Sequence, residues 1–281
     1  MRYPTLLLYL DDDARAPARL EFAARLARRF ASHLVGLSCH RPVPSVPATG
    51  PGILGVDALT IELAQARERA TSREQAFRTQ CDALELTSFE AQADDDDEPG
   101  RAIVLRGAQA DLAILGQPDP ADPDPAARRR IVDDVLAHAG RPTLVLPYAG
   151  RFERPADVVL VAWDGSAQCA RATADALPLL AAARAVHLVK FDPLLGPGAA
   201  ADPALLAPAR RWLARHGVQA SASVLALGGN VGEALLSHAA DLDADLLVMG
   251  AWGHARWQER LLGGATRTVL ESMTLPVLFA H

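Results

Sequence analysis

The chain has 281 residues, 50% of them hydrophobic, so it is long enough for one or two domains with substantial cores. A net charge of −6 at pH 7 argues against a nucleic-acid partner, because such partners usually require a basic surface. The sequence has no apolar run of membrane-spanning length and no secretion signal, so we expect a cytoplasmic protein with no membrane partner. Its three scattered cysteines lack CxxC spacing and indicate neither a disulfide framework nor a metal site.

The first half of the chain alternates between predicted strands and predicted helices. The strands lie at 5–10, 33–39, 87–91, 111–115 and 142–147, and the helices at 17–31, 57–84, 99–107 and 131–139. A Pro- and Gly-rich segment at 42–55 is expected to be a loop. Its residues 50–55 match G-x-G-x-x-G, but they lack the tight strand-to-helix context of a dinucleotide site, so we treat the match as false.

The second half repeats the alternation. Residues 158–163 form a continuous apolar run, as in a parallel strand that is buried on both faces. Alternation of this kind predicts a mostly parallel sheet with helices on both faces. The predicted strands lie at 158–163, 185–191, 220–225, 245–249 and 276–280, and the predicted helices at 167–183, 203–216, 231–240 and 265–273.

The two halves are related by an internal repeat. Three features recur at a single offset of 134 residues: Asp-Leu-x-x-x-Gly at 111 and 245, Val-Leu at 135 and 269, and Pro at 142 and 276. Separate features that share one offset indicate duplication more strongly than composition does. We therefore predict two domains, 1–147 and 156–281, joined by a polar linker at 148–156.

Four glycines mark a candidate anion site in the second half. Gly250, Gly253, Gly263 and Gly264 lie between the fourth predicted strand of this half and the helix that follows it. Glycines at such a junction let backbone N–H groups approach an anion closely, and the positive end of the helix dipole favours a phosphate. Their spacing is that of neither a Walker loop nor the dinucleotide fingerprint.

This spacing resembles the G-x2-G-x9-G-[S/T] nucleotide signature of the universal stress protein family, with Gly264 standing at the Ser/Thr position. The resemblance is strong over 156–281 and weak over 1–147. It implies an α/β fold of two tandem doubly wound domains, each with a five-stranded mostly parallel sheet. Such a fold is Rossmann-like and similar to that of the adenine nucleotide alpha hydrolases. It also implies that the fifth strands, 142–147 and 276–280, lie side by side, so that one chain imitates the family's dimer; a further homodimer stays open.

The resemblance assigns a role to each candidate site residue. The carboxylate of Asp164 would accept hydrogen bonds from ribose hydroxyls, and Met249 would lie against the nucleoside. Ala162 would offer its backbone to the base and Phe191 an apolar contact to adenine. The glycines Gly250, Gly253, Gly263 and Gly264 would hold the phosphates of ATP or AMP, with or without Mg²⁺.

Structural alternatives exist for several of these residues. Asp164 can cap the following helix, and Met249 can be an ordinary core residue. His254, Arg256 and Arg260 either add positive charge beside the phosphates or form a solvated loop face.

The first half lacks the glycine motif. At the 134-residue offset, Asp119, Arg129 and Arg130 replace Gly253, Gly263 and Gly264, and Gly116 corresponds to Gly250. Of the whole set of candidate site residues, only Gly116 and Asp11, which ends the first predicted strand as Asp164 ends its own, have counterparts in this half. The loop after Gly116 is rich in proline, which removes backbone donors, and in aspartate, which repels phosphate. We therefore expect a degenerate first domain that binds no nucleotide.

Three functions follow from the resemblance. The first is a stress-response protein that binds ATP or AMP in its C-terminal domain and signals through conformation. The second is a nucleotide-free interaction module, favoured by the missing hydroxyl at Gly264. The third is a slow ATPase or phosphotransferase; the sequence contains no nucleophile elbow and no catalytic base marked near the glycines, so we expect no other enzyme activity.

Overall fold

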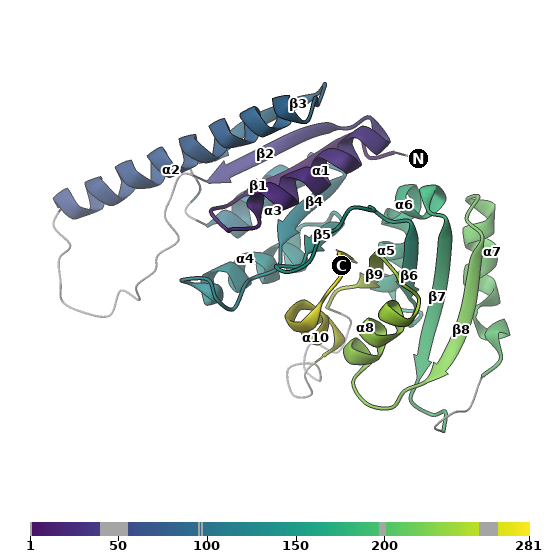
Figure 1. Cartoon of the computed structure of the whole chain (residues 1–281). Coiled ribbons are helices and arrows are strands. Elements are labelled where there is room, and N and C mark those ends of the chain that lie inside the picture. The colour runs from purple at the N-terminus through teal and green to yellow at the C-terminus, as the bar shows by residue number, and fades with distance from the viewer. Residues whose placement is uncertain (1, 40–55, 95, 97, 197–200, 253–263) are drawn as a thin grey trace. The chain divides into compact units, whose positions relative to one another are not determined.

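The computed structural model describes residues 2–39, 56–94, 96, 98–196, 201–252 and 264–281. The chain divides into two compact units (Figure 1). The first is Tyr3–Ala139, and the second is Gly140–His281 together with the N-terminal Met1–Arg2. Each unit is an α/β structure built on a sheet whose strands are mostly parallel, which confirms the predicted fold class. The expected loop at 42–55 and the glycines Gly253 and Gly263 lie outside the described residues.

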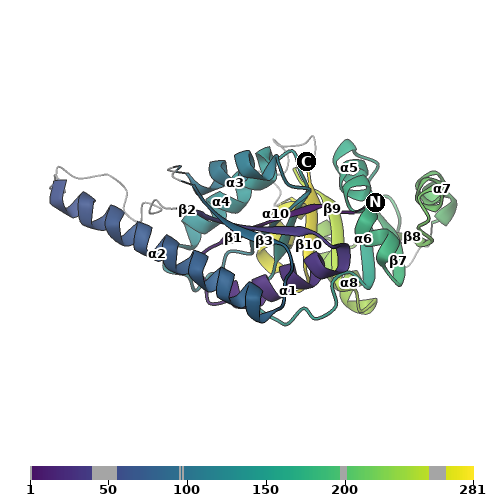
Figure 2. The ribbon, with the colours of Figure 1, turned by 90° about the horizontal axis from the view of Figure 1, so that it is seen from above.

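The first unit has a parallel sheet with strand order β3-β2-β1-β4. Figure 2 shows α1 and α2 on one face of this sheet and α3 and α4 on the other. The strands of this unit are β1 (Thr5–Leu10), β2 (His33–Cys39), β3 (Phe89–Asp94) and β4 (Leu112–Gly116), and its helices are α1 (Ala16–Phe30), α2 (Val56–Ala83), α3 (Pro99–Gly107) and α4 (Pro125–His138).

The second unit has a sheet with strand order β5-β10-β9-β6-β7-β8, in which only the β5–β10 pair is antiparallel. Strand β6 leads to β7 on one side and has β9 on the other, so the strand order reverses here, at the usual place for a ligand crevice. The strands are β5 (Thr143–Leu146), β6 (Val158–Ala162), β7 (Ala185–Asp192), β8 (Ala220–Ala226), β9 (Leu246–Gly250) and β10 (Val277–Ala280). The helices are α5 (Ala167–Asp175), α6 (Leu177–Ala182), the 3₁₀ helix η1 (Pro203–Leu206), α7 (Ala207–Arg215), α8 (Val231–Asp241) and α10 (Ala265–Ser272).

Strands β5 and β10 lie side by side, as the resemblance implies. They pair antiparallel, with Val277 opposite Val145 and Leu278 opposite Leu144. All residues of both strands are buried. By compactness β5 belongs with the second unit, although it ends the first repeat in sequence.

Two predicted helices differ from the observed ones because of proline. The predicted helix 167–183 is broken into α5 and α6, since Pro178 has no N–H to continue the helical ladder. Helix α4 begins at Pro125 rather than at 131. Proline is favoured at a first helical position, and the Asp124 carboxylate accepts the N–H of Ala127 at 2.9 Å as the N-cap.

Smaller differences lie at two other elements. The predicted helix 203–216 starts as the 3₁₀ turn η1, where Asp202 accepts the N–H of Ala204 at 2.8 Å, and continues as α7. Strand β3 lies at Phe89–Asp94 rather than at 87–91, in register with Leu34–Cys39 of β2.

The sequence repeat has a counterpart in hydrogen bonding. Asp245, just before β9, accepts the N–H groups of Asp157 at 2.7 Å and Val158 at 3.1 Å, at the start of the neighbouring strand β6. At the equivalent position of the first unit, Asp111 accepts the N–H of Thr5 at 2.8 Å. The recurring aspartate therefore connects the first strand of each sequence repeat, β1 or β6, to the strand beside it.

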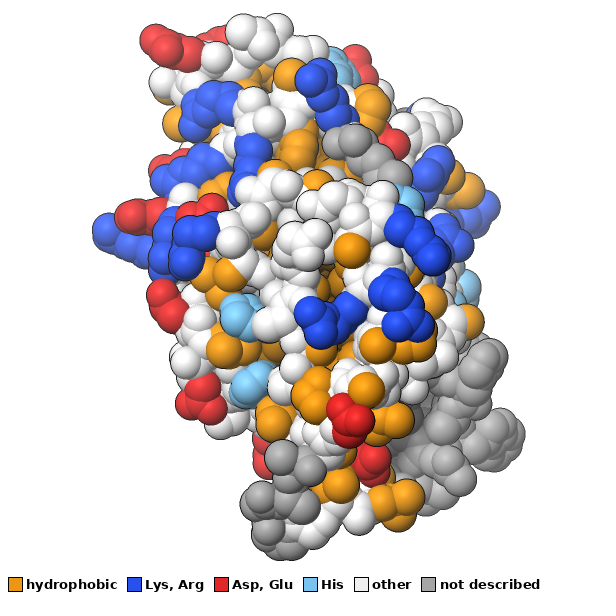
Figure 3. Space-filling model, turned by 90° about the vertical axis from the view of Figure 1, so that its right-hand side faces the viewer, with side chains coloured by type: hydrophobic (Ala, Val, Ile, Leu, Met, Phe, Trp, Pro, Cys, Tyr) orange, Lys and Arg blue, Asp and Glu red, His pale blue; other side chains and the backbone are white. Residues whose placement is uncertain are grey.

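The surface around α7 carries basic side chains in separate groups. Figure 3 shows Lys and Arg on this face with acidic, apolar and other side chains between them. Arg210, Arg211 and Arg215 of α7 are exposed.

Within the described part of the chain, no helix is both long and apolar enough to cross a membrane, and no group of three metal-ligating side chains is found.

Replacing Asp245 by alanine should destabilise the second unit. Two partly buried N–H groups would lose their acceptor, at a cost of about 1–3 kcal/mol in the free energy of unfolding. Asp241→Ala is the control, because this aspartate is exposed at the end of α8 and should change stability by less than about 0.5 kcal/mol. Chemical denaturation followed by circular dichroism measures both; equal effects would contradict the fastening role.

The three cysteines should be unreactive in the folded protein. Burial raises the pKa of Cys39 to about 12 and that of Cys81 to about 12, and it also raises the pKa of Cys169. Since the thiolate is the reactive form, a chromogenic disulfide reagent at about pH 8 should titrate no thiol in the native protein and all three after unfolding. A thiol that reacts at the rate of free cysteine would contradict the packing around it.

Candidate functional site

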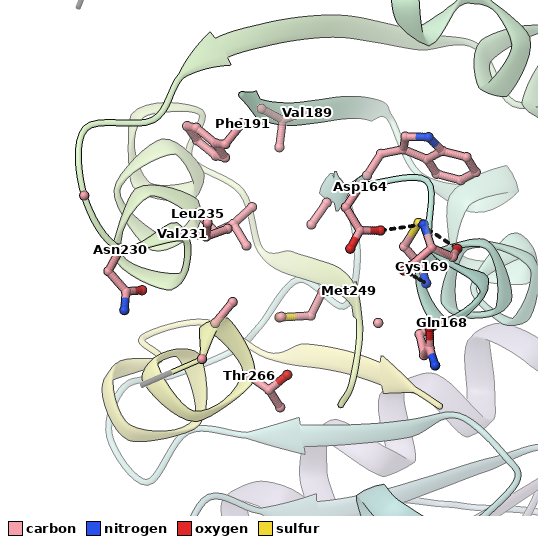
Figure 4. A pocket seen from close by; sticks show the side chains of 17 residues that line it. Asp164, Gln168, Cys169, Val189, Phe191, Asn230, Val231, Leu235, Met249 and Thr266 are labelled. Carbon is pink, nitrogen blue, oxygen red and sulfur yellow. Dashed lines mark hydrogen bonds between the residues drawn. The ribbon is translucent and has the colours of Figure 1, made fainter. Parts of the chain in front are cut away.

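A cavity of about 510 Å³ opens at the carboxyl ends of β6, β7 and β9 in the second unit (Figure 4). Its position is the switch point of the sheet, where α/β proteins of this type bind ligands. It is lined by residues from these strands and from the starts of the helices that follow them: Ala162, Trp163, Asp164, Ser166, Gln168, Cys169, Val189, Phe191, Gly229, Asn230, Val231, Leu235, Met249, Gly250, Gly264, Ala265 and Thr266.

Three helices begin at this cavity. The N-cap residues of α5, α8 and α10 are Ser166, Asn230 and Gly264, and all three line it. The first N–H groups of a helix have no partner within the helix, and the dipole makes its N-terminus positive, so such ends bind anions. No Lys or Arg is among the described lining residues, so the positive potential comes from the backbone.

The three helix starts differ in how they are capped. The Oγ of Ser166 accepts the N–H of Cys169 at 3.1 Å, and Oδ1 of Asn230 accepts the N–H of Gly232 at 2.7 Å. Gly264 has no side chain and makes no such bond at α10. Helix α10 therefore keeps the most donor capacity for an anion in the cavity.

Asp164 is held on the wall of the cavity as a carboxylate. One of its oxygens accepts the N–H of Ser166 at 2.8 Å, across a turn in which Gly165 has φ +85°, a conformation that favours glycine. Burial by itself raises the pKa of Asp164, but hydrogen bonds from Ser166 and Cys169 outweigh it and hold that pKa below its ordinary value. Ser166 is the N-cap of α5, so the alternative in which Asp164 caps this helix is wrong.

The opposite part of the cavity is apolar. Figure 4 shows Val189 and Phe191 of β7 and Leu235 of α8 around the same space as the Asp164 carboxylate. Met249 of β9, 5% exposed, forms the wall between them. This combination of apolar surface with a few fixed polar groups is typical of sites for small organic ligands.

The structure brings together six of the eight residues singled out in the sequence. These are Ala162, Asp164, Phe191, Met249, Gly250 and Gly264, which line one cavity. The other two, Gly253 and Gly263, lie outside the described residues, as do His254, Arg256 and Arg260 between them.

Gly250 has a packing role as well as a place in the cavity wall. A Cβ at this position would lie 2.7 Å from the backbone N of Cys169 and 2.7 Å from Cβ of Gln168. Only glycine lets the start of α5 approach the end of β9 this closely.

Sequence reasoning missed several polar residues of the cavity, among them Asn230, Thr266 and Gln168. Asn230 caps α8 and donates from Nδ2 to Oγ1 of Thr268 at 3.0 Å; an Asn just before a predicted helix is a recognisable N-cap signal. Thr266 Oγ1 accepts the N–H of Trp252 at 3.3 Å, and Gln168 has a buried Oε1 with no partner among the described residues. No sequence pattern indicated these last two.

The second half of the chain matches a known protein family. Residues 156–281 match the model of the "Universal stress protein family". A universal stress protein from Synechocystis sp. is 30% identical over 150 residues, which covers 52% of this chain and 49% of that protein, so the match spans about half the length of this relative.

Solved structures match over nearly the whole chain. The crystal structure of a universal stress protein from Archaeoglobus fulgidus DSM 4304 covers 98% of this chain and is itself covered to 95%, with a TM-score of 0.71 and 17% identity. A functionally unknown protein from Pseudomonas aeruginosa PAO1 matches with a TM-score of 0.57 and 19% identity, over 99% of this chain and 92% of its own. At these identities the likeness establishes the fold.

Gly250→Ala should destabilise the second unit in the absence of any ligand. The added Cβ would meet backbone atoms at the start of α5, and overpacking of this kind costs about 1–3 kcal/mol. Gly228→Ala is the matched control, since a Cβ there meets nothing within 4 Å. Thermal unfolding of both variants measures the difference; a Gly250→Ala protein as stable as Gly228→Ala would contradict the close approach of α5 to β9.

Proposed function

We propose that this chain, of which residues 156–281 match the universal stress protein family, binds an adenine nucleotide, ATP or AMP, in the cavity of its second unit. The observation that carries the proposal is the convergence of three helix N-termini on a cavity that also holds an apolar wall and an ionised aspartate. A nucleotide has these three parts: a flat base, a hydroxyl-bearing sugar and an anionic phosphate.

The two ends of the cavity suit the two ends of a nucleotide. The base would lie against Phe191 and Leu235, where apolar surface is available. The ribose hydroxyls would donate to Asp164, whose lowered pKa keeps it an acceptor at neutral pH. The phosphates would lie at the start of α10, beside Gly250 and Gly264.

Gly264 bears on which nucleotide is preferred. A glycine at this N-cap offers only backbone, so a terminal phosphate gains no hydroxyl donor from this position. We expect weaker selection for ATP over AMP than a Ser or Thr would give. Mg²⁺ would enter with the phosphates, because it prefers to be held through substrate phosphates and a few carboxylates.

Signalling through conformation fits this site better than turnover. A bound nucleotide would tie the starts of α5, α8 and α10 together, and such binding shifts the population of the bound conformation. Asp164 is a weak base because its pKa is low, so it is poorly suited to activate water for hydrolysis. The second candidate is a nucleotide-free interaction module, which the missing hydroxyl at Gly264 favours.

Asp164→Asn should weaken nucleotide binding. The amide keeps an oxygen for the N–H of Ser166 but removes the charge that the ribose hydroxyls would meet, so we expect about a 10–100-fold weaker Kd for AMP and ATP. Asp175→Asn is the control, because this carboxylate lies at the end of α5 and pairs with Arg171 outside the cavity. Isothermal titration calorimetry with AMP, ATP and cyclic AMP, with and without Mg²⁺, measures each Kd.

Two outcomes of this experiment would decide against the proposal in different ways. Failure of the native protein to bind any of these nucleotides, together with mass spectrometry that finds none in the purified protein, would favour the nucleotide-free module. Binding that is equally strong in Asp164→Asn and in the native protein would mean that the nucleotide lies elsewhere.

A further inference from the structure

The first unit has a site at the position equivalent to the cavity of the second unit, but a side chain fills it. We call this site, at Asp11 and Gly116, the cradle. Asp11 follows β1 and Gly116 ends β4, as Asp164 follows β6 and Gly250 ends β9. The space at these strand ends is about 20 Å³ in the first unit, compared with about 510 Å³ in the second. A cradle of 20 Å³ has no room for a nucleotide.

The side chain that fills the cradle is Arg19 of α1. Although arginine is rarely buried, this residue is only 3% exposed. Its guanidinium forms ion pairs with Asp11 and with Asp13, the latter at 2.8 Å. It also lies directly over Gly116, where an added Cβ would overlap Nη1 of Arg19.

A second arginine, from α4, also pairs with Asp11. Nη1 of Arg128, in α4, lies 3.0 Å from the Asp11 carboxylate, and its Nε lies 2.9 Å from Asp122. Asp11 is thus held between two guanidinium groups, with Arg19 at Oδ1 and Arg128 at Oδ2. Its counterpart Asp164 makes no ion pair among the described residues and lines the open cavity. No ribose hydroxyl could reach Asp11.

Charge keeps this arrangement in place. Burial lowers the pKa of Arg19, but Asp11 and Asp13 raise it by more, so the guanidinium stays charged. Burial likewise raises the pKa of Asp13, and the charge and hydrogen bond of Arg19 lower it by more. In the second unit the residue beside the equivalent glycine is the neutral Gln168, which makes no ion pair.

We propose that Arg19 is the permanent occupant of the first unit's ligand cradle. Its guanidinium lies beside Asp11 and over Gly116, in the place that a ligand's sugar takes beside Asp164 and Gly250 in the second unit. The comparison with a sugar rests on the proposed function; the occupancy by Arg19 does not. The consequence is one nucleotide site per chain.

Chemical rescue tests the occupancy without any nucleotide. Arg19→Ala leaves a cavity between two buried carboxylates, so the midpoint of thermal unfolding should fall by about 10 °C. Methylguanidinium at about 20 mM should refill the cavity and raise this midpoint by about 3–6 °C in a saturable manner. Arg25→Ala removes an exposed arginine of the same helix that pairs with Glu21, and it should show neither the large fall nor the rescue.

If Arg19→Ala does not fold, the double variant Arg19→Ala with Asp13→Asn provides a second test. It removes one buried charge of each sign and leaves Asp11 paired with Arg128. Methylguanidinium should still stabilise it, by a smaller amount, because one carboxylate remains. No rescue in any foldable Arg19 variant, or equal rescue in Arg25→Ala, would overturn the proposal.

Nucleotide stoichiometry separates this proposal from the proposed function. In equilibrium dialysis with AMP, the native chain should hold one equivalent and Asp164→Asn markedly less. A second equivalent bound in the native chain, or a full equivalent kept by Asp164→Asn and lost in Arg128→Ala, would show an open first cradle and overturn the proposal. If methylguanidinium rescues Arg19→Ala but the native chain binds no AMP, the occupancy of the cradle by Arg19 is supported and only the proposed nucleotide site is refuted.

Discussion

The close approach of helix α5 to the end of strand β9 is the constraint on which the cavity depends. Gly250 allows it, because any Cβ there would collide with the backbone of Cys169 and with Gln168. With α5 seated against β9, the turn before it holds Asp164 on the cavity wall through the N–H of Ser166. The starts of α8 and α10 are fixed to each other from the other side, where Asn230 bonds Thr268 and Gly232 packs against Ala265 and Thr268. Three helix N-termini therefore meet at one place with few charged side chains between them.

The two units share the same arrangement of strand ends, but the space there is open in the second unit and filled in the first. Each has a parallel strand pair that ends in an aspartate and a glycine, and each has a helix that starts between them. In the first unit an arginine from that helix neutralises the aspartate and covers the glycine; in the second a glutamine stands beside the glycine and the aspartate faces an open cavity. A buried arginine between two carboxylates is stable only as a complete set, because removing one partner leaves an uncompensated buried charge. The ion pairs of Arg19 therefore hold this place in the first unit closed.

Much of the architecture was predictable from the sequence. Strands β1, β6 and β9 are continuous apolar runs, and such runs alternating with amphipathic segments predict a parallel α/β sheet. The glycine spacing pointed to Gly250 and Gly264, and the family resemblance pointed to Asp164. They line one cavity because residues at the carboxyl ends of parallel strands meet at one edge of the sheet. Pro178 also indicated the break between α5 and α6, but the Ala- and Leu-rich residues around it favoured the prediction of one continuous helix.

The sequence by itself determined the fold class, the repeat and the residues at the strand ends, since these follow from periodicity and local backbone preference. Only the tertiary structure decided which strand-end cradle is open. Arg19 belongs to an ordinary amphipathic helix in sequence, and nothing in its spacing indicates that it reaches Asp11, Asp13 and Gly116. Thr266 and Gln168 likewise become cavity residues only because α10 and α5 begin beside β9. Local patterns specify elements, whereas a cavity is the space left between side chains that are far apart in sequence, and that space is fixed only when the elements pack.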